Sequence, residues 1–567
     1  MLILTNIYNL TIRDRANAAL WFAETYGLMP KSLTMEEGGS IKQHTINLAK
    51  IHKNYHIYIP EQDKPNKESQ STPPVSPTHV RENCSSVTLT DTSPTSSKQY
   101  KTTRFDSMPD EEKETIKSLT FILNKFGVSL EAYHEITQLP GNKEIARSYM
   151  VEGCQSYFDD QLEVTKTPGP FEGAELNLKV LLKEALNNHV CLPKSITLTS
   201  KIQKKITYKV KVSGDGAKMT RNSNLVVFSF ALLDQGGTVM SSTGNHTIAI
   251  IKTAESFHNL KESLANVVCD VNSLQKDGFI EVEGKKLKLE FVLGGDYKFL
   301  LLCLGMKQAT SNNACIYCKV HKLQRQDLTK PLQYYDSPEM KRILHPEWYK
   351  DPGCGHQYIF DIPIDHIIID ELHMMLRVTD RLEHALIYDA IDWDEEDNSG
   401  KPKHQCQDLH LKTLIKVINS CGVSFSVWKN KDNKLEWTSL MGTDKKKLLR
   451  NLPMKFDKCI HPSKLQDVRK LWQDFGDLYD TITNLNPHPN DIHNFEKEVM
   501  DWAKHLMSIK GEGYNWTNPI TPYIHILVYH VPVFLKNIGT LKIFTGQGVE
   551  KKNDDIRKAY HRKVLWT

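Results

Sequence analysis

The chain has 567 residues, which is too long for one ordinary hydrophobic core, so roughly two to four folding units are expected. Hydrophobic residues make up 40% of the chain and charged residues 25%, which excludes a largely disordered protein. The formal net charge of +4 neither indicates nor excludes a nucleic-acid ligand, because a small overall excess can hide strong local patches.

Cysteine usage and hydropathy predict a soluble protein of a reducing compartment. The 11 cysteines are spread irregularly, unlike a disulfide framework, and leave room for one metal site. The longest apolar stretches, residues 299–306 and 524–534, are shorter than the about 20 residues that a membrane-spanning helix needs. We therefore expect no membrane partner.

The first third of the chain changes character twice. Residues 1–60 have no readable role, and residues 61–105 are rich in Ser, Thr and Pro, which predicts a disordered linker. Apolar residues at spacings of three and four predict a helical region over 106–195, with an amphipathic helix at 174–188. A helical N-terminal unit is therefore expected.

Strand-like runs dominate the next part of the chain. Three apolar or β-branched runs separated by turn residues predict an antiparallel meander, which a helix and a fourth strand follow. These elements cover residues 208–213, 225–233, 246–252, 257–276 and 286–293. Three strands, a helix and a fourth strand are the opening order of an RNase H-like α/β domain, so we assign residues 196–310 to the first part of such a core.

The remainder of the chain predicts helices and loops. Between about residues 328 and 518 no series of residues indicates a sheet. We therefore expect a long, mostly helical insertion over 311–530 and a C-terminal helix over 531–567 that returns to the core. The expected helices of the insertion lie at residues 372–390, 409–420, 464–484 and 494–509.

Two aspartates follow predicted strands in glycine-rich surroundings. Asp215 lies in Val-Ser-Gly-Asp-Gly-Ala after the first strand, and Asp296 lies in Leu-Gly-Gly-Asp-Tyr after the fourth. The ends of the first and fourth strands are adjacent in an RNase H-like sheet, so the two carboxylates would face one another and hold hard cations. The alternative is that each aspartate serves a turn, since Asp-Gly is a frequent turn dipeptide.

A second set of residues has the spacing of a zinc site. Cys315 and Cys318 form a CxxC motif, and His525 and His530 supply two nitrogens far downstream. Residues five apart on an uninterrupted helix point about 140° away from each other, so one histidine must lie at a bend or an end. A redox CxxC, ordinary packing residues, or rival ligands at Cys354 and His356 are the alternatives.

These signals occur together in one order: Asp215-Gly, Phe228-Ser-Phe230, Asp296, the CxxC, His525, His530 and Glu550. In this order the chain resembles the D-D-E transposases related to the V(D)J recombinase catalytic subunit and the Transib-type transposases. Asp296 lies 19 residues before Cys315 and Glu550 lies 20 residues after His530, and both intervals are typical of that family. The resemblance covers about residues 170–567 and is closest over 520–550.

The resemblance implies a DNA transposase or recombinase that nicks DNA and transfers 3′-hydroxyl ends, with hairpin intermediates. Asp215, Asp296 and Glu550 would bind Mg²⁺ or Mn²⁺ as the catalytic triad. A structural Zn²⁺ would tie the start of the insertion to its end and return Glu550 to the sheet. The implied partners are double-stranded DNA with transposon-end repeats, a second copy of the chain and an accessory subunit, and the implied location is the nucleus. The zinc ligands would be Cys315, Cys318, His525 and His530.

Two other functions stay open at this stage. A domesticated relative would bind DNA or a protein without cutting, and an RNase H-like nuclease would hydrolyse DNA without joining ends. Basic clusters at 201–221, 445–450 and 551–563 predict either DNA-backbone contacts or solvated faces. Asp370 and His373 are close in sequence to other acids and histidines, but Asp370 is better interpreted as a helix N-cap and His373 as a packed or capping residue.

Overall fold

A computed structural model describes residues 32–35, 44–47, 105–126, 128–139, 145–191, 207–221 and 223–564. The chain divides into two units, residues 1–99 and residues 100–567. In the first unit, β1 (Ser32–Met35) and β2 (His44–Asn47) pair antiparallel. The other predictions for residues 1–104, including the linker, lie outside the described residues.

The second unit begins with a small helical region, as predicted. After η2 (Phe105–Ser107), the helices are α2 (Asp110–Phe126), α3 (Leu130–Gln138) and α4 (Ser148–Leu162). They pack around two small apolar clusters of their own, one of which contains Leu123 and Tyr133. The helix predicted at 174–188 begins later, as α5 (Leu178–Cys191), because residues before it form a strand.

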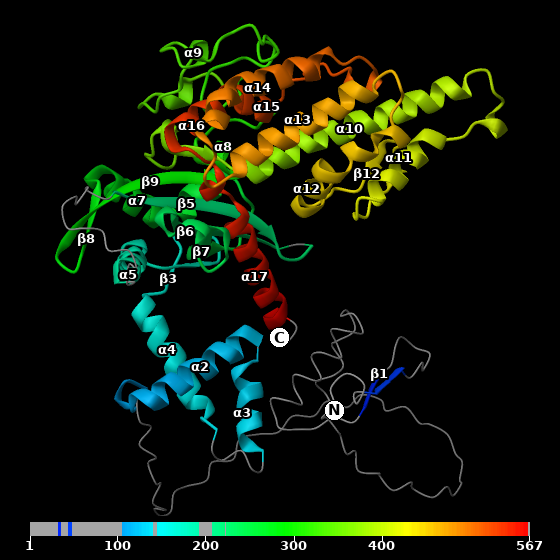
Figure 1. Ribbon diagram of the computed structural model, residues 1–567. Helices are drawn as coiled ribbons and strands as arrows, with labels where there is room; N and C mark the ends of the chain where they lie inside the picture. Colours follow the sequence, from blue (N-terminus) through cyan, green and yellow to red (C-terminus); the bar gives the residue numbers. More distant parts are fainter. Residues whose placement is uncertain are drawn as a thin grey trace, which may run out of the picture. The chain divides into compact units, whose positions relative to one another are not determined.

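A mixed sheet forms the centre of the second unit, in the order β10-β9-β5-β6-β7-β4-β3 with β8 paired to β9 (Figure 1). Strands β5, β6 and β7 are the predicted antiparallel meander. Strand β9 runs parallel to β5, and β10 runs parallel to β9. The strands are β3 (Thr165–Lys166), β4 (Gly173–Glu175), β5 (Thr207–Lys218), β6 (Asn224–Leu232), β7 (His246–Ile251), β8 (Phe279–Val282), β9 (Lys285–Gly295) and β10 (Ile367–Ile369).

The sheet is buried on both faces at its centre. Val212, Phe228 and Phe291 are fully buried on β5, β6 and β9. Helices α5 and α7 pack against the β8–β9 hairpin, and α17 packs against β5 (Figure 1). Burial on both faces explains the nearly continuous apolar run of β6, whereas the first halves of β5 and β9 carry lysines that alternate with apolar residues.

Two predictions about elements near the sheet are wrong in detail. The single helix expected at 257–276 is two helices, α6 (Phe257–Ser263) and α7 (Ala265–Asp277), which meet at Leu264. The expectation of no sheet-forming residues between about 328 and 518 also fails, because β10 joins the sheet and β11 (Val427–Lys429) pairs with β12 (Leu435–Trp437). A strand of three buried isoleucines is too short and too uniformly apolar to show a period of two.

The region after the sheet is mostly helical, as predicted. Helices α13 and α14 pack together through buried tryptophans, and the indole of Trp502 donates to the Leu471 carbonyl (3.0 Å). Long helix α10 contacts α11, α12, α13 and α15. The helices are α8 (Tyr297–Cys303), α9 (Leu332–Tyr335), α10 (Glu371–Asn398), α11 (Leu409–Asn419), α12 (Gly442–Asn451), α13 (Leu465–Thr483), α14 (Pro489–Ser508), α15 (Pro522–Tyr529), α16 (Val531–Ile538) and α17 (Gln547–Val564).

Short 3₁₀ helices connect these elements, and the helical region shares one hydrophobic core with the sheet. Within the described residues, no helix is both long enough and apolar enough to cross a membrane. The 3₁₀ helices are η3 (Leu233–Met240), η4 (Trp348–Lys350), η5 (Ile364–His366), η6 (Lys403–Gln405), η7 (Pro453–Lys458), η8 (Glu512–Tyr514) and η9 (Lys542–Phe544).

Candidate zinc centre and acidic site

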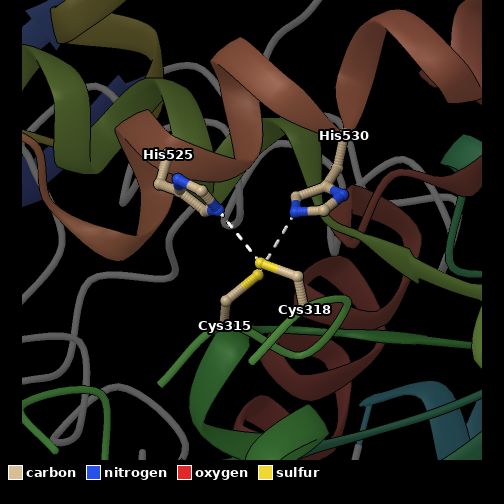
Figure 2. A group of neighbouring side chains, drawn as sticks. All are labelled: Cys315, Cys318, His525 and His530. Carbon is tan, nitrogen blue, oxygen red and sulfur yellow. Dashed lines mark hydrogen bonds between the residues drawn. The ribbon is translucent and has the colours of Figure 1, made fainter. Parts of the chain in front are cut away.

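Cys315, Cys318, His525 and His530 form a buried group, with all four ligand atoms within 4.8 Å of one another (Figure 2). The sulfur of Cys315 lies 3.4 Å from Nε2 of His530, and the sulfur of Cys318 lies 3.2 Å from Nε2 of His525. Tetrahedral zinc with ordinary Zn–S and Zn–N bonds requires an S–N separation of roughly 3.5 Å. The donor set and its spacing therefore fit a structural zinc ion.

A break between two helices brings the two histidines to the same side. His525 lies on α15, whereas His530 ends α15 with φ −115° and ψ −34° and precedes α16. The prediction that one histidine lies at a helix end is therefore confirmed. Burial lowers the pKa of His525, which favours the neutral imidazole that metal ligation requires.

A buried arginine holds the CxxC loop in shape. Arg342 is fully buried, and its Nε donates to the carbonyls of Cys315 (2.8 Å) and Cys318 (3.1 Å). One of its terminal nitrogens donates to the carbonyls of Asn313 (3.1 Å) and Pro352 (2.6 Å). Sequence reasoning missed Arg342, because an isolated arginine 24 residues beyond Cys318 carries no signal for this role.

The rival ligands lie elsewhere. The sulfur of Cys354 accepts a hydrogen bond from Arg342 at 3.7 Å, and the ring of His356 stacks on Phe257 with centroids 4.3 Å apart. Neither residue belongs to the Cys/His group. The pattern that includes the two downstream histidines is the one that the fold brings together.

Three carboxylates lie on three adjacent parallel strands: Asp296 and Asp370 directly follow β9 and β10, whereas Asp215, predicted to follow its strand, lies within β5 opposite Val227 of β6. Ser213 of β5 pairs with Gly294 of β9, and both predicted aspartates, Asp215 and Asp296, lie two residues further along. Ile369 of β10 pairs with Gly295, which brings Asp370 next to Asp296 at the same edge. The two predicted aspartates are therefore adjacent. Strand β10 adds a third aspartate, Asp370, for which the sequence predicts only a helix cap.

Glu255 is a fourth carboxylate at this edge. It follows β7, its side chain is only 8% exposed, and it pairs with Lys298. A Cβ on Gly216 would lie 3.3 Å from its Oε2, which places Glu255 beside the part of β5 that carries Asp215. Burial raises the pKa of Glu255, and the charge of Asp296 raises it further. Sequence reasoning missed it, because Ala-Glu-Ser before a helix is an ordinary N-terminal pattern.

Helix α17 brings Glu550 to the same edge. On its next turn, Nδ2 of Asn553 donates to Oδ2 of Asp215 at 2.6 Å. The ammonium of Lys211 on β5 donates to the Thr545 carbonyl at 2.7 Å, which fixes the turn that leads into α17. Residues more than 300 positions apart in the sequence are thus tied together directly.

Asp370 and His373 complete the surroundings of Glu550. The Asp370 carboxylate accepts hydrogen bonds from the backbone of Leu372 and His373, so the predicted N-cap is confirmed. It also accepts from the Gly546 amide (2.7 Å) and from Nδ1 of His373 (2.5 Å), while Nε2 of His373 lies 3.7 Å from Glu550. Asp370, His373 and Glu550 form a second group able to hold a metal ion.

The electrostatics of the site show crowded negative charge. Burial raises the pKa of Asp215 to about 7, with Asp296 and Glu255 adding to the shift. The pKa of Glu550 is raised by burial, against the charge of His373. Burial alone would lower the pKa of His373, but Asp370 raises it to about 9. A cation at this edge relieves the repulsion between the carboxylates. The protonated imidazole of His373 is one such cation.

Two tyrosines link the Cys/His group to the sheet edge that carries these carboxylates, which we call the acidic edge. The hydroxyl of Tyr317, inside the CxxC loop, donates to the Ile367 carbonyl (2.9 Å) and accepts from the Ile369 amide (3.2 Å) on β10. The hydroxyl of Tyr297, which follows Asp296, donates to the Ala314 carbonyl (2.6 Å) next to Cys315. The Cys/His group thus supports the two strand ends that carry Asp296 and Asp370.

The basic clusters divide into buried and accessible parts. Lys211 and Lys445 are fully buried, and Lys445 pairs with Asp380 and Glu383, so neither contacts a phosphate. On α17, Lys551 donates to the Met240 carbonyl (3.0 Å) and Arg557 to the Lys218 carbonyl (3.3 Å). The predicted cluster members at 201–206, and the side chains beyond residue 561, lie outside the described part of the chain.

The chain matches no protein-family model, and no curated protein matches it.

Proposed function

We propose that the chain is a D-D-E type DNA transposase or recombinase with an RNase H-like catalytic core. One observation supports this proposal most strongly: Asp215, Asp296 and Glu550 come together at one sheet edge although 335 positions separate the first from the last. The strand order adds support, since the predicted first and fourth strands, β5 and β9, are neighbours and parallel.

In this proposal Asp215, Glu255, Asp296 and Glu550 bind Mg²⁺ or Mn²⁺. Two such cations in a carboxylate site would supply an activated oxygen nucleophile and stabilise the departing oxygen of a phosphodiester. The protein contributes the rigid strand ends, and Asn553 orients Asp215 through its hydrogen bond. Carboxylates that repel one another when ionised favour divalent cations strongly.

His373 has a positioning role in the same proposal. Its imidazolium bridges Asp370 and Glu550, and so it holds Glu550 toward the sheet edge. In the metal-free site a protonated imidazole has no lone pair for a metal ion, so His373 there acts by charge and hydrogen bonding.

The remaining parts of the proposal concern zinc and partners. A structural Zn²⁺ on the Cys/His group would fix the strand ends through Tyr317 and Tyr297. We further propose double-stranded DNA with transposon-end repeats as substrate, a homodimer, an accessory subunit and a nuclear location. The repeats, the homodimer and the accessory subunit are what the family resemblance implies, and the nuclear location follows from a DNA substrate.

The proposal is tested with end-labelled duplexes taken from the flanks of the gene's own locus, incubated with Mg²⁺ or Mn²⁺. Wild type should nick the DNA and produce joined or hairpinned strands. Asp296→Asn and Glu550→Gln should each reduce both products by roughly 10³-fold or more, since each removes a ligand for charge-stabilising cations. Asp555→Asn, an exposed change on α17 that leaves the acidic edge intact, is the matched control.

The same assay separates the other functions. Metal-dependent nicking without joined or hairpinned strands would indicate an RNase H-like nuclease. Binding of the duplex without any metal-dependent cleavage would indicate a domesticated, catalytically silent relative.

A further inference from the structure

A cavity of about 370 Å³ lies between α12, α13 and the segment around η9. Three cationic side chains line it: Lys446 and Arg450 on α12, and Lys542 on η9. The acidic edge lies close by, because the ammonium of Lys542 is 3.1 Å from Oε1 of Glu371, the neighbour of Asp370. The Lys542–Glu371 ion pair thus connects the cavity to the Asp370 end of the acidic edge.

Two of the three cations are free to bind an anion. Lys542 is paired with Glu371, but within the described residues no carboxylate lies within ion-pair distance of Lys446 or Arg450. Burial lowers the pKa of Lys446, and the charge of Lys542 lowers it further. An anion between these side chains would relieve that like-charge repulsion.

A buried hydroxyl adds a donor that lacks a partner. Tyr479 lines the cavity, is 5% exposed, and its hydroxyl oxygen has no hydrogen-bond partner in the described part of the chain. The ammonium of Lys446 lies 5.7 Å from the centre of its ring. Burial of a hydroxyl without a partner is unfavourable, so a ligand that accepts a hydrogen bond from it would offset that cost.

The cavity is not uniformly basic. Asp477 and Asp480 on α13 also line it, so its three cations and two carboxylates leave a net charge of +1. That balance suits one phosphate group and disfavours a highly charged free ligand. Two unpaired cations with a tyrosine hydroxyl form a donor set for phosphate oxygens.

We propose that this cavity binds one phosphate of the DNA backbone, on a strand that passes the acidic edge. The inference rests on the proposed function, since DNA is its occupant. Lys446 and Arg450 supply charge-assisted hydrogen bonds, and the hydroxyl of Tyr479 donates a third. Such a contact positions the duplex and carries no base sequence information.

The test measures affinity for the flanking duplex by fluorescence anisotropy over a series of salt concentrations. All variants carry Asp296→Asn, which removes cleavage from the measurement. Lys446→Gln and Arg450→Gln should each weaken binding roughly three- to tenfold and reduce the salt slope by about 0.9. Asp480→Asn should tighten binding, which is an effect that damage to the fold would not produce.

Lys447→Gln is the matched control. Lys447 is the next lysine on α12, but it contacts Asp444 (2.9 Å) and the Gly422 carbonyl (3.0 Å) and does not line the cavity. Its replacement should leave both affinity and salt slope unchanged. Equal losses in Lys446→Gln and Lys447→Gln, or no loss in either, would overturn the inference.

Two further outcomes separate the inference from the proposed function. Wild type that cleaves DNA while Lys446→Gln and Arg450→Gln bind normally would overturn the inference alone. An absence of DNA binding by wild type would overturn both. Inorganic phosphate that raises the Tm of wild type but not of Arg450→Gln, with unchanged DNA affinity, would show a free-phosphate site and contradict the DNA assignment.

Discussion

The Cys/His group and the acidic edge are both rich in metal-binding side chains, but they differ in how accessible those side chains are. The Cys/His group is buried, and its two sulfurs and two nitrogens would fill all four positions around a tetrahedral zinc ion. The acidic edge is half-exposed, and Glu550 keeps 41% of its side chain accessible. A closed site suits structure and an open site suits chemistry, so the two sites should respond differently to the loss of one ligand.

The largest expected effect is on the closed site. Cys318→Ser should abolish zinc binding and lower the Tm by roughly 10 °C or more, because metal binding at such a site contributes directly to folding. The measurement is zinc content by mass spectrometry together with a thermal scan. Wild type should hold one zinc ion per chain at this group, and a strong chelator should reproduce the variant.

Cys354→Ser is the control for that prediction. Cys354 is also buried and near the CxxC loop, but it contacts Arg342 instead of the histidines. Its replacement should leave zinc content unchanged. Loss of zinc in Cys354→Ser with retention in Cys318→Ser would show that a different ligand set binds the metal.

At the acidic edge, the removal of one carboxylate should raise the stability of the metal-free protein instead of lowering it. The pKa of Asp215 is about 7 in the fold against an ordinary value of 3.8, so folding favours its protonated form. Below about pH 4 Asp215 is protonated in both the folded and the unfolded chain, so it does not reduce the stability of the fold. As the pH rises to about 7, the unfolded chain ionises first and the free energy of unfolding falls by about 4 kcal/mol. In EDTA, Asp215→Asn should therefore be more stable than wild type at pH 8 and about equally stable at pH 4.

Denaturant unfolding at several pH values checks this difference. Added Mg²⁺ should stabilise wild type at pH 8 and have less effect on Asp215→Asn, since the variant lacks one carboxylate ligand. A stability difference that stays constant between pH 4 and pH 8 would contradict the raised pKa. Asp555→Asn should follow wild type throughout.

The smallest effect concerns the link between the two sites. Tyr317→Phe removes the hydroxyl that bonds Ile367 and Ile369, which leaves buried backbone groups without partners and costs about 1–3 kcal/mol. Zinc content should stay unchanged while DNA cleavage falls roughly tenfold, because the β10 edge is less firmly held. Tyr334→Phe, an exposed tyrosine on α9, should change neither.

The sequence predicts the closed site better than the open one. The CxxC motif and the histidine pair each fit a zinc site, the family resemblance joins Cys315, Cys318, His525 and His530 into one set, and the need for a helix end at one histidine is confirmed at His530. Patterns of apolar residues also predict β5, β6, β7, β9 and the long helices. The strands, the helices, the CxxC motif and the histidine pair each depend on local spacing, which a sequence displays directly.

The parts that sequence reasoning misses depend on contacts between distant segments. Strand β10 has only three residues, and no local pattern brings it beside β9. Glu255 and His373 have ordinary local contexts, and only the sheet order brings them to Asp215 and Glu550. Arg342 binds carbonyl groups of a loop, and carbonyl groups are present at every residue.

The distance in sequence between Glu550 and its partners affects the order of assembly during synthesis. Asp215, Glu255 and Asp296 emerge from the ribosome within 81 positions of one another, but Glu550 follows 254 positions later. Helix α17 packs Ile556 and Tyr560 against the β5–β6 hairpin, and this packing holds Glu550 at the sheet edge. A partly synthesised chain therefore carries an incomplete carboxylate set, so any chemistry at this edge waits until the helical region has been translated.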